Sequence, residues 1–138
     1  MSTVTVWRVE FFTTKKSVDG SDEGVFTDGL LHDFMSKYCN SNGKALPEYP
    51  TPRKDIGIER WPHEYEKCAC ESIDSLRHWF GDKAIIKQLT KHDVVIRKLK
   101  VPADAVVFGQ TQVIYDHTKA QVLDTYPVKQ LFELSEAD

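Results

Sequence analysis

The sequence predicts a single domain of the α+β class, and three observations carry that prediction. Residues 3–12 alternate as a β-strand does. A helical region begins near Ser72, and several short strands follow it. Because helices and strands do not alternate regularly, the order favours α+β over a parallel α/β sheet. With 138 residues, of which 41% are hydrophobic, residues 1–138 are expected to build one self-sufficient core.

The first predicted strand carries apolar residues on both faces. Val4 and Val6 share one face with Arg8 and Glu10, whereas Trp7 belongs to the other face. A strand that is apolar on both sides is typical of the middle of a sheet. We therefore expect this strand to be central.

The following segments are predicted as a polar loop over 15–24 and a helix over 28–38. From 39 to 67 the regular pattern fades, and the segment contains Pro47, Pro50, Pro52 and Pro62. A loop of this length without secondary structure is uncommon in a compact domain and is often functional. The 40–67 loop is therefore a candidate contact surface.

In the second half of the chain, Cys68-Ala69-Cys70 is predicted as a short strand and Ser72 as the N-cap of a helix. Gly81 and Asp82 divide the helical region, with Asp82 capping its second part. Further strands are predicted over 93–100, 112–115 and 120–123, and the acidic residues 131–138 are expected to fray.

The amino-acid composition argues against some classes of partner and cellular location. The net charge of −3 argues against a nucleic-acid partner, because phosphate binding usually needs a basic surface. Three cysteines are an odd number and form no disulfide framework, which favours a reducing cytoplasm. No apolar stretch approaches membrane-spanning length, so no membrane association is expected.

Arg8 has two interpretations. A guanidinium on a buried strand needs a partner, because an unpaired buried charge is very costly. It can line a pocket and bind a phosphate or carboxylate through its planar fork. Alternatively, it forms a structural pair with Glu10 or another acid, and the pattern by itself favours this second interpretation.

Gln110 and Gln112 lie one residue apart after Gly109, so alternation along a strand points both amides to the same side. Their amides can orient a ribose hydroxyl or a carboxamide, but they cannot act as a general base. The alternative is that both are polar residues on the solvated face of a half-buried strand.

A metal site is not expected. Cys68, Cys70 and His63 form a loose cluster, but zinc usually takes four ligands with two-residue gaps between paired cysteines. A zinc-stapled interaction domain built on these three residues stays the third alternative for the whole protein. A catalytic cysteine is also weakly supported, because the sequence does not indicate which residue would act as its base.

Several short motifs resemble those of ADP-ribosyltransferase-like folds, in the same order along the chain. Val6-Trp7-Arg8-Val9 resembles their first strand, the block from Cys68 to Leu76 resembles their second motif, and Gly109-Gln110-Thr111-Gln112 resembles the start of their third. The resemblance implies a split, mostly antiparallel sheet with flanking helices. The chain also resembles small bacteriophage proteins with a W-R-V-E start, a P-x-P-x-x-D-x-G-I segment over 50–58 and a Trp79-Phe80 helix end.

The resemblance implies NAD as cofactor and transfer of ADP-ribose to a host macromolecule. Arg8 would hold the ribose or phosphate, Ser72 would order the pocket, and Gln110 and Gln112 would contact the nucleotide. Gln112 stands where active transferases carry an acid, and an amide offers no negative charge to a developing cation. Either another acid, such as Asp116 or Glu71, supplies that charge, or the domain binds without transferring.

This departure supports a second hypothesis, a non-catalytic protein that inhibits a host or defence factor. It would keep the fold and bind its protein target through the 40–67 loop. Either hypothesis predicts a location in the host cytoplasm.

Overall fold

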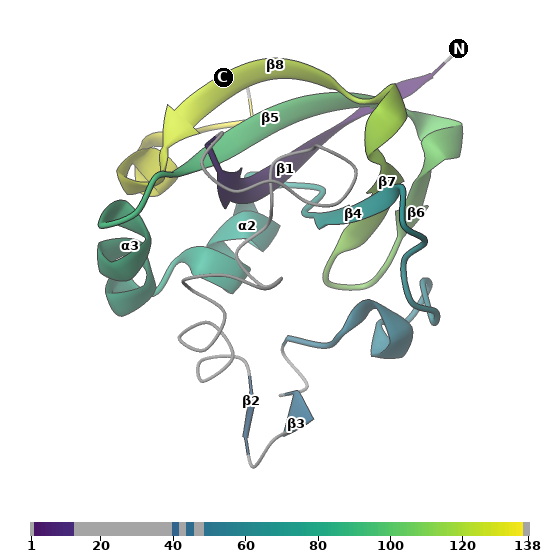
Figure 1. Cartoon of the computed structure of the whole chain (residues 1–138), viewed down its shortest axis with the longest axis horizontal. Helices are drawn as coiled ribbons and strands as arrows, with labels where there is room; N and C mark the ends of the chain where they lie inside the picture. The colour runs from purple at the N-terminus through teal and green to yellow at the C-terminus, as the bar shows by residue number, and fades with distance from the viewer. Residues whose placement is uncertain (1, 13–39, 42–43, 46–48, 137–138) are drawn as a thin grey trace.

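The computed structural model describes residues 2–12, 40–41, 44–45 and 49–136 (Figure 1). The predicted loop 15–24 and helix 28–38 lie outside these residues. The described strands are β1 (Thr3–Phe11), β2 (Asn40–Ser41), β3 (Lys44–Ala45), β4 (Glu66–Ala69), β5 (Val94–Pro102), β6 (Val106–Phe108), β7 (Val113–Asp116) and β8 (Gln121–Pro127). The α-helices are α2 (Ile73–Phe80) and α3 (Lys83–Thr90), and the 3₁₀ helices are η1 (Pro52–Lys54), η2 (Ala103–Ala105), η3 (His117–Lys119) and η4 (Val128–Glu133).

Two small antiparallel sheets of three strands each form the framework, and β2 and β3 form a separate pair. The first sheet has the order β1-β5-β8 and the second has the order β4-β7-β6. An isolated bridge joins β1 to β4, where Trp7 and Cys70 exchange two backbone hydrogen bonds of 2.7 Å. The α+β class is therefore confirmed. The expectation that the first strand is central is wrong for its own sheet, because β1 lies at the edge of the β1-β5-β8 order. Its other side contacts the second sheet through this bridge.

The two α-helices begin where local sequence signals place them. The Ser72 hydroxyl accepts a hydrogen bond from the Ser75 backbone N–H at 3.0 Å, and the Asp82 carboxylate accepts one from Ala84 N–H at 2.8 Å. Each cap satisfies a backbone donor that has no partner within its helix. Gly81 ends α2, and a Cβ atom there would lie 2.3 Å from the Arg77 carbonyl oxygen. The two predicted N-caps and the division between the helices are confirmed.

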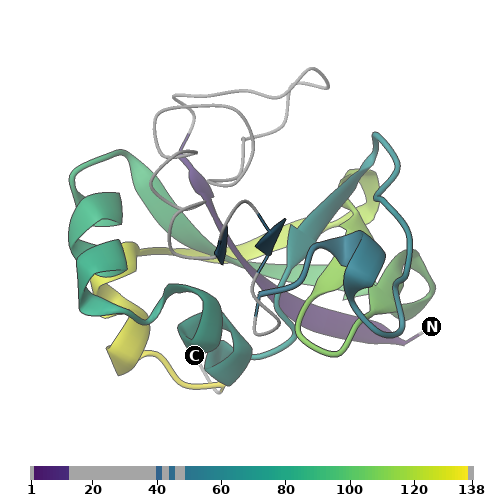
Figure 2. The same cartoon turned by 90° about the horizontal axis from the view of Figure 1, so that it is seen from below.

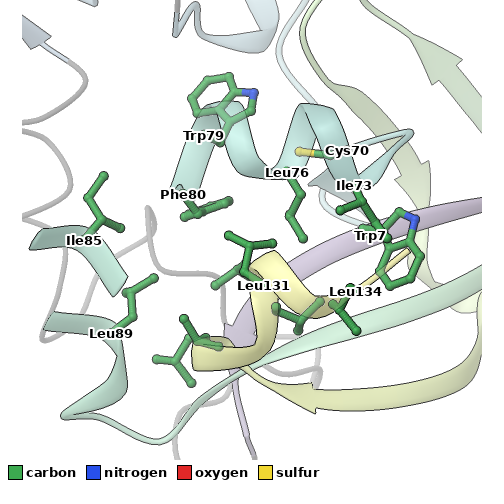
Figure 3. Close-up of a cluster of buried hydrophobic side chains, with 14 of the residues drawn as sticks. Trp7, Cys70, Ile73, Leu76, Trp79, Phe80, Ile85, Leu89, Leu131 and Leu134 are labelled. Atoms are coloured by element: carbon green, nitrogen blue, oxygen red, sulfur yellow. The ribbon is translucent and has the colours of Figure 1, made fainter. Parts of the chain in front are cut away.

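The larger core lies where α2, α3 and η4 pack on β1 and β5 (Figures 1 and 3). Trp7, Leu76 and Leu89 are fully buried in it. Burying an apolar side chain of this size contributes about 1.5–3 kcal/mol. The other buried members of this core are Val9, Phe11, Cys70, Ile73, Trp79, Phe80, Ile85, Val94, Ile96, Val128, Leu131 and Leu134.

Residues 131–136, the described part of the segment expected to fray, pack into this core, so the expectation is wrong for them. Leu131 and Leu134 are only 1% and 7% exposed. Together with Val128 they repeat every three residues, which matches the three residues per turn of a 3₁₀ helix. The Arg77 guanidinium donates to the carbonyl oxygens of Leu131 and Leu134, and Glu136 accepts from the Ile73 N–H at 2.6 Å. The sequence does contain a signal for this packing, an apolar residue at every third position. The acidic composition of the segment hid it.

The later strands differ from prediction in their bounds. β5 extends to Pro102, β7 covers Val113–Asp116, and β8 runs to Pro127, four residues beyond its predicted end at Leu123. β6 was not predicted as a separate strand. Its antiparallel pairing with β7 makes 109–112 the turn of a hairpin. None of the helices in the described ranges is long and apolar enough to cross a membrane.

Candidate functional site

Arg8 lies in a buried network of ion pairs. Its Nε donates to Glu10 Oε1 at 2.8 Å, and its Nη1 donates to the Cys68 carbonyl oxygen at 2.6 Å. The other Glu10 oxygen accepts from Arg97 Nε at 3.0 Å, so one carboxylate bridges two arginines from neighbouring strands. Arg8 is 8% exposed. The pairing with Glu10 that the structural interpretation requires is therefore present.

The surroundings keep Arg8 charged despite its burial. Burial by itself lowers the pKa of Arg8, but the nearby Tyr115 and Glu10 outweigh it and raise the pKa above its ordinary value. Burial raises the pKa of Tyr115 to about 12, so the phenol is neutral at physiological pH. The site thus holds a permanent cation beside a carboxylate and a neutral phenol.

Ser72 acts locally as the N-cap of α2. The same helix reaches the β6–β7 turn, because the Ser75 hydroxyl and the Trp79 indole N–H both donate to the Thr111 carbonyl oxygen, at 3.1 and 2.9 Å. These two bonds hold the helix against the turn that contains Gln110 and Gln112.

Gln110 and Gln112 do not share an environment, contrary to the expectation from alternation. Gln110 is exposed, whereas Gln112 is 6% exposed and donates from its amide to the Pro50 carbonyl oxygen at 2.7 Å. Both lie in the turn between β6 and β7 instead of within a strand, so the two-residue strand period does not apply. This hydrogen bond connects Pro50 to the residue that immediately precedes β7 of the second sheet.

Asp55, the aspartate of the P-x-P-x-x-D-x-G-I segment, is a buried acid to which the sequence assigned no role. It is 1% exposed, and its carboxylate accepts from the N–H groups of Gln110, Thr111 and Gln112 at 2.8, 3.2 and 3.1 Å. The Thr111 hydroxyl adds a fourth bond at 2.9 Å. A Cβ atom on Gly109 would lie 2.7 Å from this carboxylate, so the close approach requires glycine. We call Asp55 with the 109–112 turn the Asp55 clamp.

A second acid fastens the other end of the same segment. Glu66 accepts two hydrogen bonds from the Arg60 guanidinium, at 2.7 and 3.0 Å, and a third from the His63 N–H at 2.8 Å. The hydrogen bonds from Arg60 hold the pKa of Glu66 below its ordinary value. Ile58, between the two anchors, is 7% exposed. Residues 50–65, which we call the 50–65 segment, are therefore fastened at several points.

The 50–65 segment nevertheless exposes large apolar side chains. Ile56 is 67% exposed, Trp61 56% and Tyr65 46%. Phe108, 43% exposed, belongs to the neighbouring β6 strand, where a Cβ on Gly57 would lie 2.5 Å from the Phe108 carbonyl oxygen. Gly57 has a φ of 101°, which only glycine adopts readily. Glycine at position 57 thus allows the 50–65 segment to pack closely against β6 while the neighbouring Ile56 side chain faces solvent.

The two cysteines that the structure describes, Cys68 and Cys70, are poor candidates for a nucleophile. Burial raises the pKa of Cys70 to about 12 and also raises the pKa of Cys68. A thiol of raised pKa is a poor nucleophile, because the thiolate is the reactive form. Within the described part of the chain, no group of three or more His, Cys, Asp and Glu side chains could hold a metal ion.

Of the predicted site residues, Arg8 lies in β1, Ser72 follows β4 as the N-cap of α2, and Gln112 immediately precedes β7. β1 meets β4 at the Trp7–Cys70 bridge, and β4 pairs with β7, so Arg8, Ser72 and Gln112 belong to adjoining elements. Arg8 lies beside Tyr115, and Gln112 is three positions earlier in the chain.

Comparison with known proteins identifies a bacteriophage family. No curated protein and no solved structure matches the chain. The model of the family described as Bacteriophage T4 Y00F protein matches residues 1–129, which is most of the chain. The protein therefore belongs to the Bacteriophage T4 Y00F protein family.

Proposed function

We propose that this protein is a non-catalytic binding protein that inhibits a host or defence protein through its 50–65 segment. One observation carries the proposal. Buried polar anchors fix the segment, yet Ile56 and Trp61 remain more than half exposed. A segment that served only to complete the fold would be expected to bury such side chains, since burial of each contributes stability.

Fixing the segment in advance favours binding. Association costs free energy when loops and side chains become ordered at the interface, and a segment that is already ordered avoids much of that cost. Tryptophan and tyrosine are enriched among the residues that dominate binding energy. Trp61 and Tyr65 on a fastened segment therefore fit the role of anchors that enter pockets on a partner.

Membership of a bacteriophage family supports a partner of bacterial origin. Three of the four side chains that the resemblance assigns to the nucleotide add weight to a non-catalytic role. The Arg8, Ser72 and Gln112 side chains are all engaged in hydrogen bonds that support the fold, and the Gln110 backbone N–H belongs to the Asp55 clamp.

The test is site-specific cross-linking in host cells, with a photo-cross-linking amino acid in place of Trp61. A single host protein should be trapped, and the purified partner should bind Trp61→Ala at least about tenfold more weakly than wild type. Phe132 provides a matched control, because it is 59% exposed but lies in η4 outside the segment. Equal binding by Trp61→Ala and wild type, or equal trapping from position 132, would contradict the proposal.

A second candidate is an NAD-dependent ADP-ribosyltransferase with the corresponding split-sheet topology. The observation that favours it is the adjacency of β1, β4 and β7, which bear or adjoin Arg8, Ser72 and Gln112 in the order of the motifs. In this proposal Arg8 holds the ribose or phosphate of NAD, Ser72 orders the pocket, and Gln110 and Gln112 orient the ribose. The amide of Gln112 would leave transfer slow, because it supplies no charge to the cationic transition state.

Nicotinamide release distinguishes the two candidates. The binding-protein proposal expects neither wild type nor Gln112→Glu to bind NAD at millimolar concentration or to release nicotinamide. Release by wild type at roughly one per second or faster would establish an enzyme. A gain of release on Gln112→Glu would identify a slow transferase site instead.

A further inference from the structure

We propose that the partner presents an acidic surface around an apolar pocket, and that Ile56 enters the pocket while Arg53 and Lys54 contact the acids. The inference rests on the proposed function and specifies the chemistry of the partner. It begins from η1, where Arg53 and Lys54 are both exposed and immediately precede the Asp55 clamp.

In the Asp55 clamp the negatively charged side chain of this stretch is buried, whereas its positively charged side chains are exposed. Asp55 stands between two cations and a protruding isoleucine, but its carboxylate is 1% exposed and accepts hydrogen bonds from the 109–112 turn. The carboxylate therefore contacts the 109–112 turn and not the solvent. Arg53, Lys54 and Ile56 stay on the outside, where two positive charges flank an apolar side chain that is 67% exposed.

The nearest acid on the same segment is partly engaged. Glu59 Oε2 accepts a hydrogen bond from the Gly57 N–H at 3.4 Å, and Glu59 has a φ of 59°, an unusual conformation for a residue with a side chain. The exposed side chains of this tip, those of Arg53, Lys54, Ile56 and Glu59, carry two cations against one acid, whereas the buried Asp55 makes the whole 53–59 stretch neutral. The whole chain carries −3.

A positive tip on an acidic protein selects its partner by charge. Complementary potentials raise the association rate and disfavour partners of the wrong sign. An acidic partner would be repelled by most of this protein and attracted by the tip, which would orient the encounter. Such steering weakens as salt concentration rises.

The test uses the purified host protein cross-linked at position 61 as the probe. The double variant Arg53→Glu/Lys54→Glu should bind it at least about tenfold more weakly than wild type, chiefly through a slower association rate, and should lose most of the salt dependence. Arg53→Gln/Lys54→Gln should show a smaller effect in the same direction. Thermal melting of each variant verifies that it remains folded.

The matched control reverses two other exposed lysines. Lys83→Glu/Lys87→Glu makes the same change in charge on α3, and Figures 1 and 2 show α3 and η1 at opposite ends of the molecule. This variant should change the affinity by less than about twofold, because exposed charges beyond a Debye length are largely screened.

The outcomes separate the inference from the proposed function. If Ile56→Ser abolishes binding but charge reversal in η1 has no effect, the acidic partner is refuted and the binding role stands. If neither variant affects binding, both proposals fail. If the 50–65 segment cross-links to nucleic acid instead of protein, the protein partner is refuted, and both the proposed function and this inference fail.

Discussion

The two halves of this protein are held together by different forces. In one half, α2, α3 and η4 cover the first sheet, and the core between them is built from large apolar side chains (Figure 3). In the other half, the second sheet shares a small apolar cluster with the first, including Val6, Leu99 and Tyr115. The 50–65 segment is fastened to it by the carboxylate of Asp55 and the amide of Gln112.

The difference lets one half of the protein stabilise the fold while the other half holds apolar side chains at the surface. An apolar core is stabilised by burying side chains, so its apolar residues are not available to contact a partner. Hydrogen bonds to a buried carboxylate fix the backbone without requiring the neighbouring side chains to be buried. The 50–65 segment can therefore be ordered while Ile56 and Trp61 face solvent. Three measurements test this comparison, and we give them from the largest expected effect to the smallest.

The apolar half should govern global stability. Leu76 is fully buried in the core, so Leu76→Ala should lower the free energy of unfolding by about 2–5 kcal/mol through lost burial and a residual cavity. Urea denaturation measures the change. Leu123→Ala is the control, because Leu123 is 43% exposed on β8 and its loss should fall within about 0.5 kcal/mol. Similar losses for the two variants would show that the core does not dominate.

The Asp55 clamp should govern local order. Asp55→Asn keeps the size of the side chain but removes its charge and one acceptor oxygen, so it should cost about 1–3 kcal/mol. Hydrogen exchange should accelerate in residues 49–60 and 109–112 and remain slow in α2 and β5. Asp104→Asn, on an exposed residue of η2, should leave exchange unchanged. Uniform acceleration across the molecule would mean that the two halves unfold as one unit.

The Glu66 anchor should give a modest dependence of stability on pH. Its folded pKa is lowered, chiefly by hydrogen bonds from Arg60, so its contribution is fully present above the unfolded value near 4.5. The contribution is lost as the pH falls from there through the folded pKa. Because Arg60 is 37% exposed, solvent screening keeps the contribution to about 1 kcal/mol or less.

Thermal melting between neutral and acidic pH detects this contribution as a difference between wild type and Glu66→Gln that shrinks on acidification. Glu64→Gln is the control, because Glu64 is exposed and adjoins the same anchor. A difference that stays constant with pH would show that Glu66 acts through packing and not through its charge.

Local signals in the sequence were reliable where neighbours in the chain decide the structure. Ser72 and Asp82 cap their helices because a cap needs only the next two or three residues. Alternation identified β1, and Pro102 ended β5 close to the predicted position. The α+β class followed from these local elements.

The candidate site depended on contacts that no local pattern contains. Arg8 donates to the carbonyl oxygen of Cys68, sixty positions later, and Gln112 donates to Pro50, sixty-two positions earlier. The sequence indicated that Arg8 needed a partner and suggested Glu10, two residues away. It could not identify Arg97 as the second cation on Glu10, because that contact depends on the pairing of β1 with β5.

The sequence by itself therefore determined the class of the fold and the two helices with their caps. It predicted 40–67 as a loop without secondary structure, but the described part of that range contains β2, β3, η1 and the start of β4. Only the tertiary structure decided that Asp55 is a buried clamp, that the C-terminal segment completes the core, and that Gln112 is a fastening residue. The physical reason is the range of the interactions. Caps and strand alternation act over a few residues, whereas a buried polar side chain takes whichever partner folding brings to it from a distant part of the chain.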